Sequence, residues 1–135
     1  MKQNNQVAIY IRVAHENKEK VNGQKVELER YCKVKDYKIY NIYVDNGFSG
    51  RTTNRPAFRE MLADFWNKKF RKIIVYDLSR LSRDISELSW FINLFAHKSV
   101  ELESIKENLN SLSASGKMFS SVLTMISEIG GKNVF

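Results

Sequence analysis

Arginine is the residue type in this sequence whose pattern points most directly to chemistry. Arg80 and Arg83 stand three residues apart, shortly after the apolar run 73–76. A short run rich in β-branched residues is typical of a strand buried on both faces. In an open α/β sheet, ligands bind beyond the carboxyl ends of such strands. Each guanidinium carries a permanent charge and a planar fork of donors, so the pair favours a phosphate group.

Two more arginines follow other expected elements. Arg12 lies near the end of the apolar run 7–13. Because an unpaired buried charge is costly, Arg12 should point into a polar site, or else reach solvent from the strand end. Arg55 follows the turn cluster 46–50. Carboxyl ends of parallel strands share one edge of a sheet, so all four arginines can converge there. Such a cluster can stabilise a phosphoryl transition state by its charge alone.

The elements that must position these arginines alternate along the chain. The sequence predicts strands at residues 7–13, 39–45, 73–76 and 100–105, and helices at 22–35, 56–66, 84–97 and from 116 onward. This order predicts an α/β fold with a mostly parallel sheet of four to five strands. The second strand should be buried on both faces. The fourth carries acids, so it should be short or lie at an edge.

Local patterns define two of the helices. Pro56 fits a first turn, and Asp84 with Glu87 has capping-box spacing. The last helix carries a broad apolar face formed by Met118, Val122, Met125, Ile126 and Ile129. That face exceeds what one side of a small sheet covers. We therefore expect it to contribute to an oligomer interface, the alternative being a helix packed into its own core.

Composition limits the possible functions. The 135 residues suffice for one domain. No apolar run approaches the roughly 20 residues that span a bilayer, and no apolar signal region begins the chain. We therefore expect a cytoplasmic protein with no membrane partner. The net charge of +7 favours a polyanionic partner, although a solvated lysine-rich surface has the same composition.

Other familiar sites are not indicated. The single cysteine, Cys32, excludes an internal disulfide, and the two histidines are far apart, so no metal site is expected. The run SGKM at 115–118 resembles the end of a P-loop. Met118 stands where that loop needs Ser or Thr, and Ser111 stands where it needs its first Gly. We therefore exclude nucleotide binding and expect no cofactor.

Taken in order, the motifs resemble those of serine recombinase catalytic domains, the family of resolvases, invertases and large serine integrases. The segments that carry this resemblance are IYIRV at 9–13, YVDNGFSG at 43–50, NRP at 54–56, RLSRD at 80–84 and SGKM at 115–118. They span nearly the whole chain. The resemblance implies a resolvase-like three-layer fold with helices on both faces of the sheet and a long C-terminal helix. It also implies that residues 1–135 stop within that helix, with the DNA-binding region absent.

The resemblance further implies an activity. The family cleaves double-stranded DNA with a serine hydroxyl, which forms a phosphoserine link to the 5′ end. The ends are exchanged and rejoined without metal or ATP, as in the integration of mobile elements. Implied partners are double-stranded DNA and, in the full-length protein, a homodimer and a synaptic tetramer. The implied phosphate contacts are Arg12, Arg55, Arg80 and Arg83, with Gln24 and Ser49 in support.

The departures from the family pattern concern the chemistry itself. Ala14 occupies the position of the nucleophilic serine, so the chain should be unable to cleave DNA, either as an engineered variant or as a natural pseudoenzyme. Ser79 stands where many members have an aspartate before Arg80, which should slow any cleavage, and Lys18 replaces a glutamine. We do not expect Ser79 or Ser82 to act as substitute nucleophile, because each would attack from the wrong strand.

Two alternative functions remain. The first is a non-catalytic DNA-binding or assembly module that regulates an active recombinase. The second is an unrelated phosphate-binding α/β domain.

Overall fold

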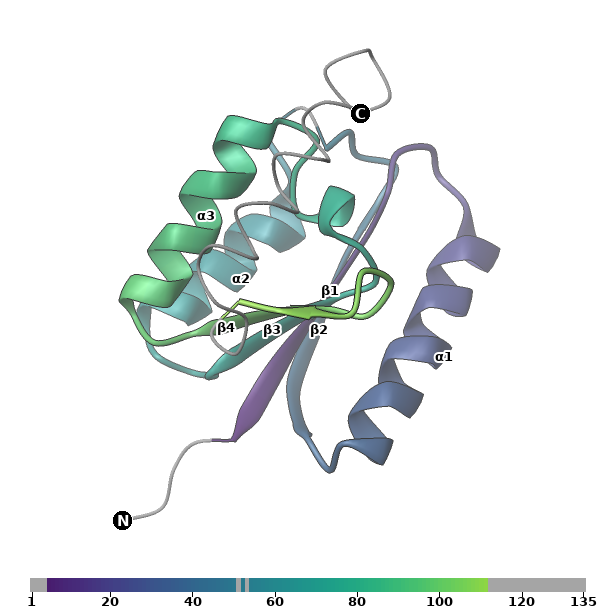
Figure 1. Ribbon diagram of the computed structural model, residues 1–135. Coiled ribbons are helices and arrows are strands. Elements are labelled where there is room, and N and C mark those ends of the chain that lie inside the picture. Colours follow the sequence, from purple (N-terminus) through teal and green to yellow (C-terminus); the bar gives the residue numbers. More distant parts are fainter. Residues whose placement is uncertain (1–4, 51, 53, 112–135) are drawn as a thin grey trace.

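The computed structural model describes residues 5–50, 52 and 54–111. A five-stranded sheet in the order β2-β1-β3-β4-β5 separates α1 on one face from α2 and α3 on the other (Figure 1). The elements are β1 (Gln6–Val13), α1 (Lys18–Val34), β2 (Lys38–Asn46), α2 (Pro56–Trp66), β3 (Lys72–Val75), η1 (Leu78–Arg80), α3 (Ile85–His97), β4 (Glu101–Ser104) and β5 (Leu109–Asn110). β5 alone pairs antiparallel. The expected mostly parallel α/β sheet is confirmed.

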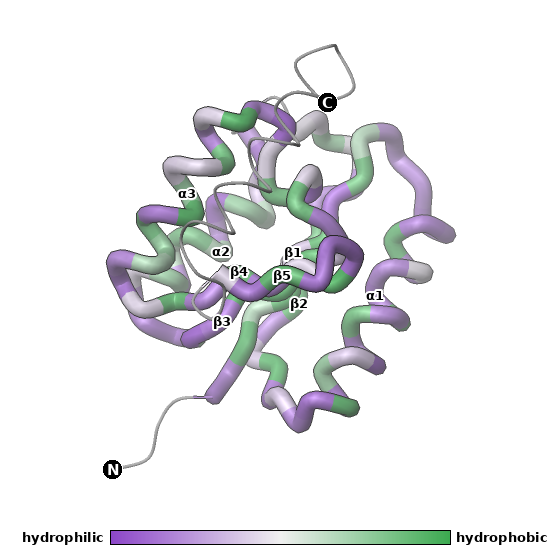
Figure 2. Tube along the Cα trace, in the orientation of Figure 1, coloured by the Kyte–Doolittle hydropathy of each residue, from purple (hydrophilic) through white to green (hydrophobic). Residues whose placement is uncertain are grey.

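The most buried strand is β1, which lies between β2 and β3 and is covered on both faces. In Figure 2 the trace of β1 is largely green, the colour of hydrophobic residues. Alternate residues face opposite sides of a sheet. Val7, Ile9 and Ile11 pack on the side of α1, whereas Ala8 and Tyr10 belong to the cluster under α2 and α3. Arg12 therefore continues the face of Tyr10.

The first helix begins earlier than the sequence predicted. Asn17 caps α1, since its side chain accepts a hydrogen bond from the backbone N–H of Lys20 at 3.0 Å. The expected start at residue 22 was wrong because Asn17 supplies a cap one turn earlier. Gly23 lies inside the helix on its exposed side, where a side chain would meet nothing within 4 Å. The helix buries Val21, Gln24, Leu28 and Cys32.

Two strands differ from expectation in their surroundings. β2 forms an edge of the sheet, and Tyr43 and Asp45 are its buried residues, so the prediction that both its faces are buried was wrong. β4 is short, as predicted. It is not an edge, because the hairpin to β5 covers it. The two-residue strand β5 was not predicted.

The predicted start of α3 is confirmed. The Asp84 side chain accepts hydrogen bonds from the N–H groups of Ser86 and Glu87 at 2.9 and 3.2 Å. Residues 112–135 lie outside the described part of the chain, so the long C-terminal helix and its apolar face stay predictions. Among the described residues, no helix is long and apolar enough to span a membrane.

Candidate active site

A cavity of about 490 Å³ opens near the carboxyl ends of β1 and β3. Ala14 and Gln24 line it together with Arg80 and Arg83. The strand β1 ends one residue before Ala14, and the turn η1 after β3 delivers Arg80. The topology thus brings the expected nucleophile position and two of the four arginines to one site, although they lie 66 or more residues apart in sequence.

The segment that carries Arg80 and Arg83 is fixed by its apolar neighbours. Leu78 and Leu81 are buried to 1 % and 0 % exposure and anchor the turn in the core. Arg83 donates its backbone N–H to the carbonyl of Gly50 at 2.9 Å, which ties this segment to the loop after β2. The arginine side chains, in contrast, remain partly exposed. Such an arrangement presents positive charge on a rigid frame.

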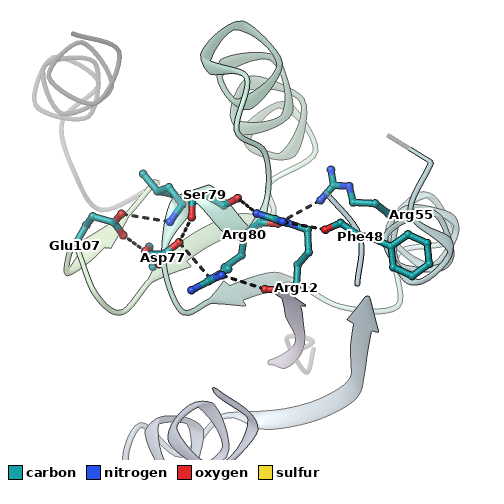
Figure 3. Close-up of polar contacts among 9 residues, drawn as sticks. Arg12, Phe48, Arg55, Asp77, Ser79, Arg80 and Glu107 are labelled. Carbon is teal, nitrogen blue, oxygen red and sulfur yellow. Dashed lines mark hydrogen bonds and ion pairs between the residues drawn. The ribbon is translucent and has the colours of Figure 1, made fainter. Parts of the chain in front are cut away.

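Arg12 lies behind this cavity and does not line it. Its guanidinium is fully buried and donates to the carbonyls of Phe48, Ser79 and Arg80 at 3.0, 2.6 and 3.0 Å (Figure 3). Burial, with the nearby charges of other arginines, lowers the pKa of Arg12 to about 10. Arg12 therefore remains charged at neutral pH. In this structure it connects β1 with the loops that follow β2 and β3.

Arg55 is likewise buried at the start of α2. Its Nε donates to the carbonyl of Thr52 at 2.8 Å, and its Nη1 is 3.2 Å from both the Tyr10 hydroxyl and the Arg80 carbonyl. The guanidinium also stacks over the Phe58 ring at 4.1 Å. Its buried Nη2 has no hydrogen-bond partner among the described residues. The carbonyl of Arg80 thus accepts from both Arg12 and Arg55, which brings three arginines together.

Asp45 is a buried residue of this site that the sequence reasoning missed. It is 1 % exposed, accepts the Tyr10 hydroxyl at 2.7 Å and also accepts the N–H groups of Ala57 and Phe58. These amides lie in the first turn of α2, so Asp45 caps that helix from the neighbouring strand. Burial and the bond to Asp45 raise the pKa of Tyr10. The sequence signal that could have identified Asp45 is a charged residue within an otherwise half-buried strand.

Two further residues were expected to support the site, and of these Gln24 lines the cavity whereas Ser49 does not. Gln24 is nearly buried and its Oε1 has no hydrogen-bond partner in the described residues. Ser49 is exposed and does not line the cavity. Its neighbour Gly50 is tightly packed, because a Cβ there would lie 2.6 Å from Arg12 Nη2 and 2.8 Å from Arg83 Cγ. A side chain at position 50 would displace the arginines.

The two serine hydroxyls in the segment that carries Arg80 and Arg83 already have hydrogen-bond partners. Ser79 donates to Asp77 Oδ1 at 2.5 Å, and the fully buried Ser82 donates to Glu87 Oε1 at 2.9 Å. Neither serine lines the cavity. Across the described ranges, no group of three or more His, Cys, Asp or Glu residues has the geometry to hold a metal ion.

Comparison with known proteins identifies the family of this chain. The family model of the resolvase N-terminal domain matches residues 7–134. The chain belongs to the resolvase N-terminal domain family. The family prediction made from the arginine motifs is therefore confirmed.

Solved structures support the same relationship. The N-terminal catalytic domain of TP901-1 integrase is 30% identical with a TM-score of 0.81, over 96% of this chain and 99% of that one. A resolvase family site-specific recombinase from Streptococcus pneumoniae has a TM-score of 0.76 over 96% of this chain and 89% of that one. Its 24% identity supports the fold alone. The predicted resolvase-like fold is confirmed.

A curated relative is much longer than this chain. A protein of Bacillus subtilis (strain 168), described as a DNA recombinase, is 33% identical over 81 residues. The match covers 58% of this chain and 16% of that protein. The chain therefore spans a small part of the relative's length.

Proposed function

We propose that this chain is the catalytic domain of a site-specific DNA recombinase, in which the cavity receives the scissile phosphate of double-stranded DNA. The observation that supports this most directly is that Ala14 shares one cavity with Arg80 and Arg83. A nucleophile at the end of β1 would face a phosphate that the two guanidiniums hold. In the family that this sequence resembles, the nucleophile position carries serine, whereas here Ala14 offers only a methyl group.

The four arginines would have different roles in this site. Arg80 and Arg83 line the cavity and can contact the phosphate directly. Arg12 and Arg55 are buried behind them, with most of their donors bound to carbonyl groups. Their charges still act across a short distance in a region of low dielectric. We propose that they raise the positive potential and hold the cavity in shape.

The chain should bind at this site without cleaving DNA. A methyl group offers no lone pair for attack on phosphorus, so the covalent step has no nucleophile. This supports the proposal that the chain is inactive as it stands. The same substitution favours one second candidate, a non-catalytic DNA-binding or assembly module that regulates an active recombinase.

Binding of inorganic phosphate tests the arginine site. Arg80→Ala and Arg83→Ala should each weaken binding by roughly tenfold, the usual effect of losing a hydrogen bond between charged partners. Arg71→Ala is the matched control, because Arg71 is exposed and precedes β3 at the opposite edge of the sheet. The measurement is a titration followed by nuclear magnetic resonance. Equal losses in all three variants would show a diffuse basic surface in place of a site.

We also propose assembly into a homodimer and a synaptic tetramer. The support is the apolar face predicted by sequence on the last helix, which lies outside the described residues. Met125→Lys with Ile126→Lys should convert an associating protein to monomer, because a buried charge opposes contact between apolar faces. Sedimentation velocity measures the outcome, and Lys117→Ala serves as control. A parent protein that is monomeric at high concentration would refute this interface.

A further inference from the structure

Asp77 places a carboxylate directly beside the arginine cluster. It follows β3 and is 8 % exposed. Its Oδ1 lies 3.5 Å from Arg80 Nε and accepts the Ser79 hydroxyl at 2.5 Å (Figure 3). Within residues 5–50, 52 and 54–111, it is the one carboxylate in an ion pair with any of the four arginines.

A negative charge at this place opposes the attraction of a phosphate, so Asp77 does not serve to bind one. Its contacts instead determine how Arg80 is oriented. The buried Nε of Arg80 has no hydrogen-bond partner among the described residues, and Asp77 is its counter-charge. The Nη1 of Arg80 donates to the carbonyl of Arg12 at 3.2 Å. These two contacts restrain opposite parts of the guanidinium, and neither uses Nη2, which can then meet a ligand.

We propose that Asp77 is a positioning residue for Arg80 and that Ser79 holds the Asp77 carboxylate in place. The significance of this role for DNA rests on the function proposed for the cavity. Ser79 stands where the resemblance led us to expect an aspartate directly before Arg80. In this chain the carboxylate comes from two residues earlier and reaches the same guanidinium. Ser79 therefore supports Asp77, and a serine at this position does not weaken the site.

This pairing reverses an expectation drawn from sequence. On sequence alone, Ser79 should slow any cleavage, and Ser79→Asp added to Ala14→Ser should make that variant faster. In the structure, the new carboxylate would lie where the Ser79 hydroxyl now donates to Asp77. Glu107 is also close, because its Oε2 lies 3.3 Å from the N–H of Leu78. Like charges in a mostly buried place repel strongly, so Ser79→Asp should weaken phosphate binding.

The test uses Asp77→Asn in the full chain, with Glu101→Gln as the matched control. Both remove one negative charge, and Glu101 pairs with Lys72 at 3.8 Å at the far end of β3. We expect Asp77→Asn to weaken binding of inorganic phosphate about tenfold, despite the more positive site. The nitrogen resonance of Arg80 Nε should shift in the ligand-free protein. Glu101→Gln should change neither quantity.

The positioning role is overturned if Asp77→Asn binds phosphate equally or more tightly with an unchanged Arg80 resonance. If Asp77→Asn fails to fold, Ser79→Ala replaces it, and an unchanged Arg80 resonance in that variant also overturns the proposal. A different result would contradict the proposed function. If Arg80→Ala leaves phosphate binding intact, the cavity is not the phosphate site, whether or not Asp77 orients Arg80.

Discussion

Ala14→Ser is expected to create a covalent protein–DNA adduct, whereas the unmodified protein is expected to form none. The comparison requires a protein that contains this chain and binds a verified cognate site. The side chain of residue 14 lines the cavity that also contains Arg80 and Arg83. A serine hydroxyl there would face a phosphate held by both guanidiniums. Because a missing nucleophile removes the whole covalent step, the difference should be all or nothing.

The chemistry of that adduct is specific. The serine oxygen would form a bond to phosphorus while the bond from phosphorus to the 3′ oxygen breaks, leaving a 5′ phosphoserine link and a 3′ hydroxyl. Denaturing electrophoresis of labelled DNA detects the adduct, which should be alkali-labile. Ala14→Ser combined with Arg80→Ala is the control and should give much less adduct, because the developing charge loses a stabilising cation.

Three outcomes separate the possible functions. An adduct only in Ala14→Ser supports a recombinase domain disabled at one position. An adduct from the unmodified protein would contradict the assignment of position 14. If no adduct forms in Ala14→Ser on a verified site that the protein binds, a non-catalytic regulatory module is favoured.

The four parallel strands and the motifs at their ends were predictable because each depends on local sequence. Buried parallel strands read as short apolar runs, and the arginines follow those runs at the edge where parallel sheets bind ligands. The capping pattern of Asp84 and the position of Pro56 likewise depend on neighbouring residues. Local patterns of this kind gave the fold and the components of the site.

The different roles of the four arginines were not predictable, because they depend on contacts between distant loops. In the sequence, all four arginines look equivalent. In the structure, Arg12 is buried because carbonyls 36, 67 and 68 residues away converge on its guanidinium. Asp45 and Asp77 looked like ordinary polar residues beside strands. Their roles appear only when α2 and η1 are packed against the sheet.

The largest stability effect is expected from Lys72, which begins β3 and so lies at the opposite end of this strand from the segment that carries Arg80 and Arg83. Its Nζ lies 2.9 Å from Glu103 Oε1 and 2.8 Å from the Tyr37 hydroxyl, within a mostly buried network. Glu103 is 4 % exposed, and its carboxylate also accepts hydrogen bonds from Tyr31 and Asn110. Lysine is therefore the cation that balances a buried negative charge.

Lys72→Met should lower the free energy of unfolding by about 3–5 kcal/mol at pH 8, because it leaves the carboxylate buried without its cation. Chemical denaturation measures this loss. Lys38→Met, an exposed lysine on β2, should change stability by less than about 0.5 kcal/mol. Lys72→Met combined with Glu103→Gln should recover part of the loss, since no charge is then buried.

The loss should also depend on pH in a defined direction. Burial raises the pKa of Glu103 above its ordinary value of 4.5. A carboxyl group with a raised folded pKa favours folding below its unfolded pKa, and this contribution is lost as pH rises through the folded pKa. Removing the Lys72 ammonium raises the Glu103 pKa further. The stability difference between the parent protein and Lys72→Met should therefore be small near pH 4 and grow toward pH 8. A difference that is constant over this range would show that Lys72 stabilises the fold by packing and not by balancing Glu103.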